Sequence, residues 1–219
     1  MIIELEAVLL ALLIFDLDGT LVETTQLSIP LIQEEIKRYP HLKMPGPQAI
    51  QSVFGLPKKE FWETLIPDGS EEELQAIQTA WEVRLFEMMD EQDVLLPHVK
   101  EVLNELKQRG HKLTTASNCS KAYLERILES QGIKEYFDSP LCIELVQGRK
   151  KEEILQAHFA ALPKEEAYMV GDRFSDIEAA HANGIPAIAC HFGFADEGEL
   201  DEAEYHIQSL RDLLEVFPA

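Results

Sequence analysis

Hydrophobic positions follow two different patterns along this chain of 219 residues. Up to about residue 22, and again from about residue 96, short apolar runs alternate with segments whose apolar residues recur at helical spacing. Between those limits only the helical spacing is present. Alternating strands and helices predict a parallel sheet with right-handed crossovers, and an unbroken helical block within that alternation predicts an insertion. We therefore expect an α/β core formed by residues 1–22 and 96–219, with a helical cap formed by residues 23–95.

The first apolar run, Val8–Phe15, predicts a buried strand that ends abruptly at a polar turn. The run is far shorter than the ~20 residues that a membrane-spanning helix needs. Glu4 and Glu6 precede it, where a signal peptide would carry Lys or Arg. We therefore expect a cytoplasmic protein that does not associate with membranes.

Three helices are predicted within the cap. The longest begins after a Pro-Asp-Gly breaker, where Ser70 and Glu73 have the spacing of a capping box. No stretch of this block shows the alternation expected of a strand. The predicted cap helices span Gln33–Arg38, Lys59–Leu65 and Ser70–Glu91.

The second half of the chain supplies the rest of the predicted sheet. Its first helix ends at Gly110, in the position of a C-terminal capping glycine. The predicted helices span Val99–Arg109, Lys121–Ser130, Glu152–Ala161, Asp176–Ala182 and Leu210–Val216. The predicted strands span Lys112–Ala116, Ala167–Val170 and Pro186–Cys190, with a further apolar segment at Pro140–Val146.

The charge of the chain narrows the classes of partner. Lys and Arg number 19 against 40 Asp and Glu, for a formal net charge of −21. Because a phosphate backbone is bound through basic side chains, this balance argues against nucleic acid. It also requires that any anionic substrate meet locally gathered positive charge. The cysteines Cys119, Cys142 and Cys190 form no CxxC pair, which favours a reduced cytoplasmic location over a disulfide or zinc framework.

Groups able to do chemistry lie where the predicted strands end, the edge at which parallel sheets bind ligands. The first strand ends at Asp16 and Asp18, and the strand ending at Val170 is followed by Asp172 and Asp176. Carboxylates gathered at one point repel each other unless a cation lies among them, and oxygen ligands favour Mg²⁺. The other groups at this edge are Ser117, Asn118, Arg149, Lys150 and Lys151.

The ordered set of these motifs resembles the haloacid dehalogenase superfamily. The set consists of Asp16-x-Asp18-Gly19-Thr20, then Ser117-Asn118, then a lysine, then Gly171-Asp172-x-x-x-Asp176. The segments 170–177 and 183–186, together with the helical insertion, look most like the phosphoglycolate phosphatase branch. The resemblance implies a Rossmann-like core with a cap, and a phosphatase of a small phosphorylated metabolite.

The resemblance also implies roles for individual residues. Asp16 would attack phosphorus to form an aspartyl phosphate, and Asp18 would act as general acid and base. Mg²⁺ would be held by Asp16, Asp172 and the backbone carbonyl of Asp18. The remaining implied roles are phosphoryl binding by Ser117, the Asn118 amide and Lys150 (favoured over Lys151 by its spacing to Ile154), and support by Gly19, Thr20 and Asp176.

Several alternatives stay open. Asp176 also fits a helix N-terminal acid, and Lys58, Lys59 and Arg173 are possible substrate contacts that also fit solvated or locally paired charges. Dehalogenases of the superfamily carry an aromatic residue where Asp18 stands, and phosphonoacetaldehyde hydrolases carry a small one, although Lys58 could align with their cap lysine. Mutases like β-phosphoglucomutase place a His soon after the first motif, and none lies between Asp16 and Tyr39 here. A catalytically idle binding protein of this fold would usually lack one of the two motif aspartates.

Overall fold

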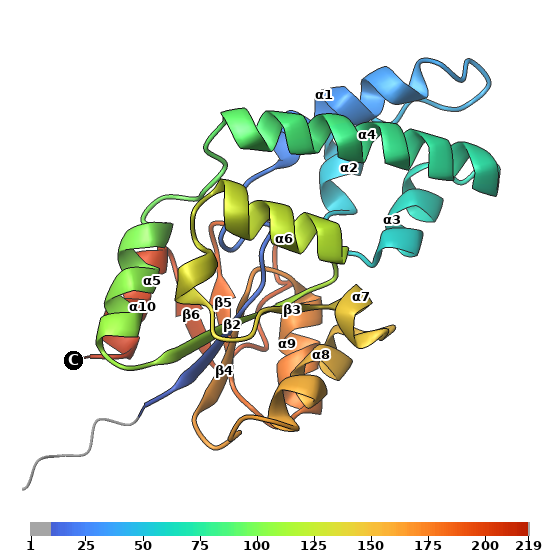
Figure 1. The fold of residues 1–219 in the computed structure, drawn as a ribbon. Helices are drawn as coiled ribbons and strands as arrows, with labels where there is room; N and C mark the ends of the chain where they lie inside the picture. The colour runs from blue at the N-terminus through green and yellow to red at the C-terminus, as the bar shows by residue number, and fades with distance from the viewer. Residues whose placement is uncertain (1–9, 219) are drawn as a thin grey trace, which may run out of the picture.

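The computed structural model describes residues 10–218, so the first two residues of the predicted strand Val8–Phe15 lie outside the described part. The centre of the molecule is a sheet of six strands in the order β3-β2-β1-β4-β5-β6 (Figure 1). All five neighbouring pairs are parallel. The strands are β1 (Leu12–Phe15), β2 (Lys112–Ser117), β3 (Leu141–Cys142), β4 (Ala167–Gly171), β5 (Ala187–Cys190) and β6 (Tyr205–Ile207).

Strand β1 lies in the middle of the sheet because every one of its side chains is apolar and buried. Leu13 and Phe15 join the hydrophobic cluster on one face, and Leu12 and Ile14 join the cluster on the other. A parallel sheet covered on both faces requires such a continuously apolar strand. The helices α5 (Val99–Gln108), α6 (Lys121–Ser130) and α10 (Leu213–Val216) contribute to the first cluster, and α8 (Lys151–Phe159) and α9 (Phe174–Ala182) to the second. The shorter elements are α7 (Ile143–Val146) and two 3-10 turns, Lys134–Tyr136 and Leu210–Asp212.

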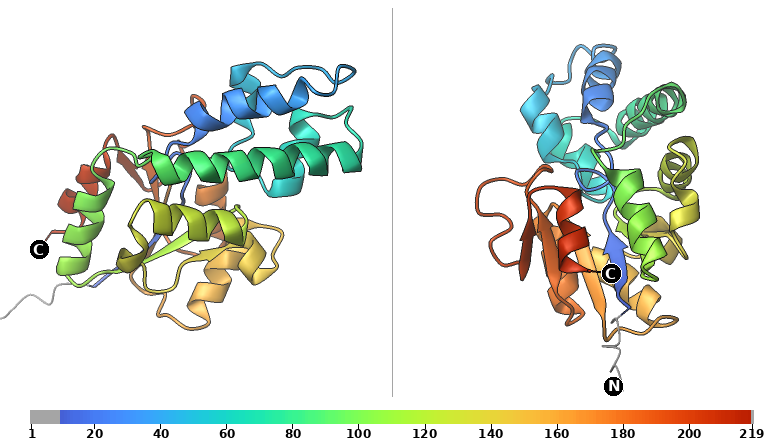
Figure 2. Two further views of the ribbon diagram at one scale, coloured as in Figure 1. Left: turned by 45° about the horizontal axis from the view of Figure 1, so that its top comes forward. Right: turned by 90° about the vertical axis from the view of Figure 1, so that its left-hand side faces the viewer.

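The segment between β1 and α5 forms a layer of helices on one side of the sheet (Figure 1, Figure 2). We call residues 23–95 the cap and the rest of the described chain the core. The cap has a hydrophobic cluster of its own, centred on side chains such as Ile32, Trp62 and Ile77. Its helices are α1 (Thr25–Ile36), α2 (Pro47–Ser52), α3 (Lys58–Leu65) and α4 (Glu71–Glu91).

The two connections between cap and core run side by side. The Glu23 amide donates to the Val94 carbonyl, and the Leu96 amide donates to the Leu21 carbonyl, each at 2.9 Å. Helix α4, which leads into the second connection, begins with the expected capping box of Ser70 and Glu73. The chain therefore passes between core and cap at two adjacent connections, close to the end of β1.

Several elements differ from the sequence prediction. Helix α1 begins at Thr25 instead of Gln33 and includes Pro30 as an interior residue. Pattern reading treats proline as a break, and Pro30, the sixth residue of α1, does remove the hydrogen bond to the Gln26 carbonyl, but the helix continues past it to Ile36. The apolar segment Pro140–Val146 divides into β3 and α7, and neither α2 nor β6 was predicted.

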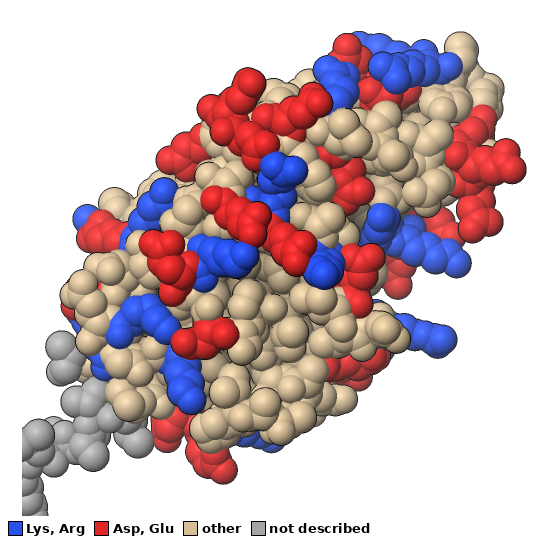
Figure 3. Space-filling view, viewed as in Figure 1, with Lys and Arg blue, Asp and Glu red and all other residues tan. Residues whose placement is uncertain are grey.

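The surface carries charges of both signs. On the face shown in Figure 3, Lys and Arg side chains lie among Asp and Glu instead of gathering in one basic patch. Within residues 10–218, none of the helices combines the length and apolar character needed to cross a bilayer.

Candidate active site

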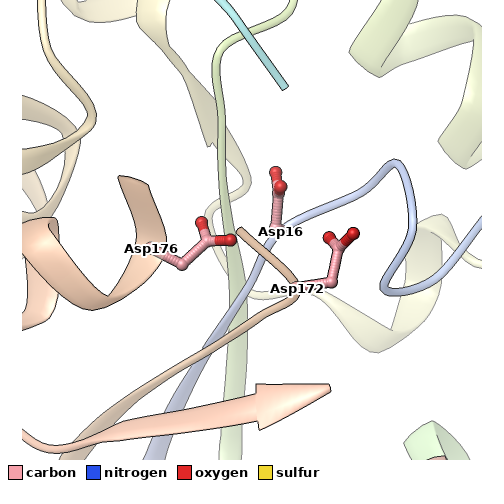
Figure 4. A group of neighbouring side chains, drawn as sticks. All are labelled: Asp16, Asp172 and Asp176. Atoms are coloured by element: carbon pink, nitrogen blue, oxygen red, sulfur yellow. The ribbon is translucent and has the colours of Figure 1, made fainter. Parts of the chain in front are cut away.

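Three buried carboxylates meet at the carboxyl end of the sheet. Asp16 directly follows β1, Asp172 follows the neighbouring strand β4, and Asp176 lies in the first turn of α9. Each offers an oxygen within 4.8 Å of the others, and their side chains turn toward a common space in Figure 4. None of the three residues is more than 2% exposed. The strand pairing causes this meeting, because Phe15 lies opposite Val170 in the sheet.

The lysine at this centre is Lys151. Its Nζ lies 3.0 Å from Asp16 Oδ2 and 2.5 Å from Asp176 Oδ1. Lys150 is exposed, so the preference for Lys150 was wrong. That preference used helical spacing to Ile154, but Lys150 precedes α8 with an extended backbone (φ −131°, ψ 149°), so helical spacing does not apply to it. Lys151 is the first helical residue and shares the buried face of α8 with Ile154.

The buried aspartates differ in how many of their oxygens protein donors occupy. Asp172 accepts from the Thr20 hydroxyl (3.1 Å) and the Phe194 amide (2.7 Å). Asp176 is engaged at both oxygens, by Lys151 and by the Arg173 amide (3.0 Å). This pairing agrees with a supporting role for Asp176. Asp16 is engaged only at Oδ2, because among the described residues no donor reaches its Oδ1.

This donor set fits a hard divalent cation. If all are ionised, the three carboxylates and the Lys151 ammonium leave two negative charges in a buried space. Burial raises the pKa of Asp172 well above its usual value, and the charges of Asp16 and Asp176 raise it further. Burial alone would lower the pKa of Lys151, but the same two charges outweigh it and hold that pKa above its ordinary value. Oxygen ligands with excess negative charge are what Mg²⁺ requires.

Glycine is needed beside these ligands. Gly19 adopts φ +80°, and a Cβ built on it would overlap the Asp172 carboxylate. Its positive φ makes the turn after Asp18, so both the backbone conformation and the space exclude a larger residue. The Thr20 hydroxyl donates to Asp172 and not to a group of its own turn, where the sequence led us to expect its bond.

Asp18 lies apart from the other carboxylates. Its Oδ1 accepts from the Tyr123 hydroxyl at 2.6 Å and from the Thr24 hydroxyl at 2.9 Å. Burial raises the pKa of Asp18 to about 6, although both hydrogen bonds act to lower it. The prediction from sequence missed Tyr123 and Thr24, because single hydroxyl residues stand out in no pattern and the contact joins three separate segments.

A cavity of about 80 Å³ opens over Asp16 and Asp18. On the core side it is lined by Ser117 and Asn118 at the end of β2, so these predicted residues lie at the site. The cap contributes mostly apolar walls, with Lys58 as the one cation among the lining residues. The cap residues at the cavity are Phe54, Gly55, Leu56, Lys58, Phe61, Trp62, Gln78, Trp81 and Glu82.

Two of the predicted substrate contacts lie elsewhere. Lys59 is exposed and faces Glu63 at 3.7 Å. Arg173 joins core to cap, because its guanidinium donates to the Phe54 carbonyl (2.7 Å) and pairs with Glu199 (2.8 Å). The Asn118 side-chain amide donates to the next carbonyl of the cap, that of Gly55, at 2.8 Å.

Comparison with known proteins agrees with this architecture. Residues 13–190 match the model of the family described as haloacid dehalogenase-like hydrolase. The phosphoglycolate phosphatase of Escherichia coli is 27% identical over 150 residues, which are 66% of this chain and 60% of that protein. The phosphoglycolate phosphatase of Salmonella typhimurium is 30% identical over 151 residues, with the same two shares. The matched region therefore spans less than two thirds of these relatives.

Other relatives match over almost their whole length. A Caldanaerobacter subterraneus protein named as the pyrophosphatase PpaX is 27% identical over 208 residues, 93% of this chain and 92% of that protein. A crystal structure from Haemophilus somnus, titled as a phosphoglycolate phosphatase, has a TM-score of 0.86 at 21% identity and covers 95% of this chain and 98% of its own. CbbY of Rhodobacter sphaeroides, in complex with xylulose-1,5-bisphosphate, has a TM-score of 0.80 at 20% identity, covering 93% and 96%. The two structures show that the fold is shared.

Proposed function

This chain belongs to the haloacid dehalogenase-like hydrolases, and we propose that it is a Mg²⁺-dependent phosphatase of a small phosphomonoester. The observation that carries the proposal is the carboxylate centre around Lys151, whose member Asp16 lines a cavity beneath the cap. The Lys151 ammonium fixes one oxygen of Asp16, and the other oxygen of Asp16 has no protein donor among the described residues. This arrangement suits nucleophilic attack by Asp16 on a phosphoryl group.

Asp16 is the nucleophile in this proposal. Lys151 fixes its Oδ2 and thereby orients the carboxylate, while Oδ1 has no protein donor among the described residues. Attack on phosphorus forms an aspartyl phosphate and releases the alcohol. Asp18 protonates the leaving oxygen and then takes a proton from the water that hydrolyses the intermediate.

The remaining groups hold the phosphoryl oxygens. Ser117 and Asn118 line the cavity, and Lys151 lies 3.0 Å from Asp16, which also lines it. They would supply a hydroxyl, a backbone amide and an ammonium donor. Asp16, Asp172 and the Asp18 backbone carbonyl would hold Mg²⁺, which when bound neutralises charge on the phosphoryl oxygens and on the facing carboxylates.

The cap would select the leaving group. We propose that cap and core are separate domains which close on each other, because the cap has its own hydrophobic cluster and the chain passes between cap and core at two adjacent connections. The leaving alcohol would then meet apolar walls and Lys58. A carboxylate on that alcohol could pair with Lys58, which agrees with the phosphoglycolate phosphatase names of relatives. The three free cysteines support a cytoplasmic location for this activity.

The central test is the substitution Asp16→Asn. We expect Mg²⁺-dependent hydrolysis of p-nitrophenyl phosphate to fall at least about 1000-fold, because the amide cannot form the acyl phosphate. Asp201→Asn is the matched control, since Asp201 is exposed and outside the cavity, and it should retain full activity. Both variants should unfold as cooperatively as the wild type. Retained turnover by Asp16→Asn would remove the nucleophile assignment.

A panel of phosphomonoesters then addresses the substrate. The panel includes 2-phosphoglycolate, glycerol 3-phosphate and glucose 6-phosphate, with release of inorganic phosphate as the readout. We expect the highest kcat/KM for a small ester that carries a second negative charge, because Lys58 lies at the cavity. A preference for uncharged leaving alcohols would contradict the role of Lys58 and leave the phosphatase assignment intact.

A further inference from the structure

Three oxygens form a closed triangle beside the cavity. Tyr123 Oη lies 2.6 Å from Asp18 Oδ1, Thr24 Oγ1 lies 2.9 Å from the same atom, and the two hydroxyl oxygens are 3.0 Å apart. Each hydroxyl has one proton to donate. When Asp18 is ionised, both protons are best directed at Oδ1, because hydrogen bonds to a charged acceptor are the stronger ones. One oxygen of Asp18 is therefore occupied by two protein donors.

The other oxygen of Asp18 is not used in this way. Within residues 10–218, no protein donor is within hydrogen-bond distance of Asp18 Oδ2. Because Oδ1 is occupied on both sides, a proton bound by this carboxyl group is directed to Oδ2. A general acid needs its transferable proton on one defined oxygen, held at a fixed orientation to the leaving group.

Tyr123 is well placed to fix this orientation. Tyr123 is only 6% exposed, and its ring lies against that of Phe86 in α4, with the ring centroids 6.4 Å apart. Its backbone is set by the start of α6, where the Ser120 hydroxyl accepts from the Tyr123 amide at 3.1 Å. The hydroxyl therefore comes from a rigid helix of the core.

Thr24 and Tyr123 lie in different parts of the molecule. It lies in the first connection between core and cap, directly before α1, so any movement of the cap displaces it. Tyr123 belongs to α6 of the core, although its ring also packs against Phe86 of the cap. Of the two hydroxyls, Tyr123 is thus the one whose backbone lies outside the connection to the cap.

We propose that Tyr123 is a positioning residue that holds Oδ1 of Asp18 and so reserves Oδ2 for proton transfer to the leaving oxygen. This inference rests on the proposed phosphatase function. In the first half-reaction the bond from phosphorus to the alkoxide oxygen breaks, Asp16 forms the new bond to phosphorus, and the proton on Asp18 Oδ2 passes to the departing oxygen. Tyr123 lines the same cavity, and in this proposal its hydroxyl acts through Asp18 and not on phosphorus or the leaving oxygen.

The role predicts a dependence on the leaving group. An alkyl alcohol leaves poorly without a proton, whereas p-nitrophenolate leaves readily without one. In Tyr123→Phe, kcat/KM for an alkyl phosphomonoester should fall about tenfold, a part of the 10²–10⁴-fold that acid catalysis supplies. For p-nitrophenyl phosphate, kcat/KM should change less than about twofold. This parameter reports only the steps through formation of the aspartyl phosphate, so the later role of Asp18 as base does not enter.

The experiment compares the alkyl ester that the wild type turns over fastest, from the panel above, with p-nitrophenyl phosphate. Tyr168→Phe is the matched control, because Tyr168 is partly buried against Phe217 and lies away from the cavity. This variant should keep the wild-type kcat/KM for both esters. Thr24→Val removes the second donor and should reproduce the same selectivity with a smaller loss. Thermal unfolding of each variant verifies the fold.

The outcomes separate the two levels of inference. If the wild type hydrolyses neither substrate, the proposed function fails and the role of Tyr123 fails with it. If the wild type is active but Tyr123→Phe lowers kcat/KM equally for both esters, or raises it, only the positioning role is overturned. A loss confined to the alkyl ester, absent in Tyr168→Phe, supports it.

Discussion

The core and the cap differ in what they bring to the same cavity. The core supplies the ionisable centre: Asp16, Asp172, Asp176 and Lys151 all lie at the ends of β1 and β4 or at the starts of helices behind them. The cap supplies mostly apolar walls and, among the lining residues, one cation. Changes in the core should therefore alter the rate with every substrate, and changes in the cap should alter the ratio between substrates.

The two regions also differ in what stabilises them. The core is organised by a sheet with a hydrophobic cluster on each face. The cap is organised by an aromatic group in which the rings of Phe61, Trp62 and Trp81 lie 5.0 to 6.2 Å apart. Because Trp62 and Trp81 are the 2 tryptophans of the chain, tryptophan fluorescence reports on the cap alone. The two regions can thus be followed separately in one experiment.

The largest effect is expected from the core lysine. Lys151→Met should lower kcat at least about 100-fold with every substrate, because it removes a buried cation from the reacting carboxylate and phosphoryl group. Lys150→Met is the matched control: that residue is adjacent and exposed, and its loss should change kcat less than about twofold. Steady-state rates on the ester panel measure both. Equal losses in the two variants would contradict the assignment.

The next effect concerns the stability of the core. Saturating Mg²⁺ at about 100 times its Kd should raise the free energy of unfolding by about 2.7 kcal/mol. Asp172→Asn should abolish this rise, yet without metal it should be more stable than the wild type, because one of the three repelling carboxylates is gone. Thermal unfolding followed by circular dichroism, with and without EDTA, measures the effect. The tryptophan signal of the cap should shift less, and an equal shift would show that the two regions unfold as one unit.

A smaller and more selective effect is expected from the cap lysine. Lys58→Met should lower kcat/KM about tenfold for 2-phosphoglycolate, about 1.4 kcal/mol, since a partly exposed pairing with the leaving carboxylate is lost. For p-nitrophenyl phosphate the change should stay within about twofold. Lys59→Met, next in the chain but outside the cavity, serves as the control. A uniform loss across substrates would mean that Lys58 acts on the chemistry.

The smallest effect is a dependence of stability on pH that originates in the core. His111 Nδ1 accepts from the Ala11 amide at 3.1 Å, and burial lowers the pKa of His111 below its ordinary 6.5. The unfolded chain therefore binds the proton more tightly, so stability is full above about pH 6.5 and decreases as the pH falls below it. Between pH 7 and 5.5 the wild type should therefore lose stability through this histidine, by no more than the limit of about 1.4 kcal/mol per pH unit.

The measurement is the difference between the wild type and His111→Asn in denaturant unfolding across that range. Asparagine keeps an acceptor near Nδ1 and does not titrate. If both proteins lose the same stability on acidification, the effect belongs to other groups.

Much of this arrangement could be predicted from the sequence, since its signals are local. An apolar strand that ends in carboxylates fixes where Asp16 lies, and the alternation of strands with helices brings Asp172 to the same edge. The choice between Lys150 and Lys151 could not be made, because it depends on the residue at which α8 begins. Helix boundaries depend on capping and tertiary contacts that periodicity does not contain.

The contacts missed from the sequence are the ones that join distant segments. Tyr123 meets Asp18 only because α6 packs between the sheet and α4, and nothing in the neighbourhood of Tyr123 in the chain indicates this. The tie from Arg173 to the Phe54 carbonyl is similar, since a backbone acceptor can belong to any residue type. Strand β6, with two of its three residues exposed, lacks the apolar run that identifies the other strands.

The central position of β1 has a consequence for how the protein is made. Leu12 pairs with Lys112 on one side and with Ala167 on the other, so β1 leaves the ribosome before either of its partner strands. Until Ala167 and the residues after it have emerged, β1 is an apolar segment with one edge open, the kind of segment that chaperones bind and that aggregates at high expression. Helices α1 to α4, which pack on one another within residues 25–91, emerge before either partner strand of β1. The nucleophile is thus synthesised well before β4, the strand that brings Asp172 to the same site.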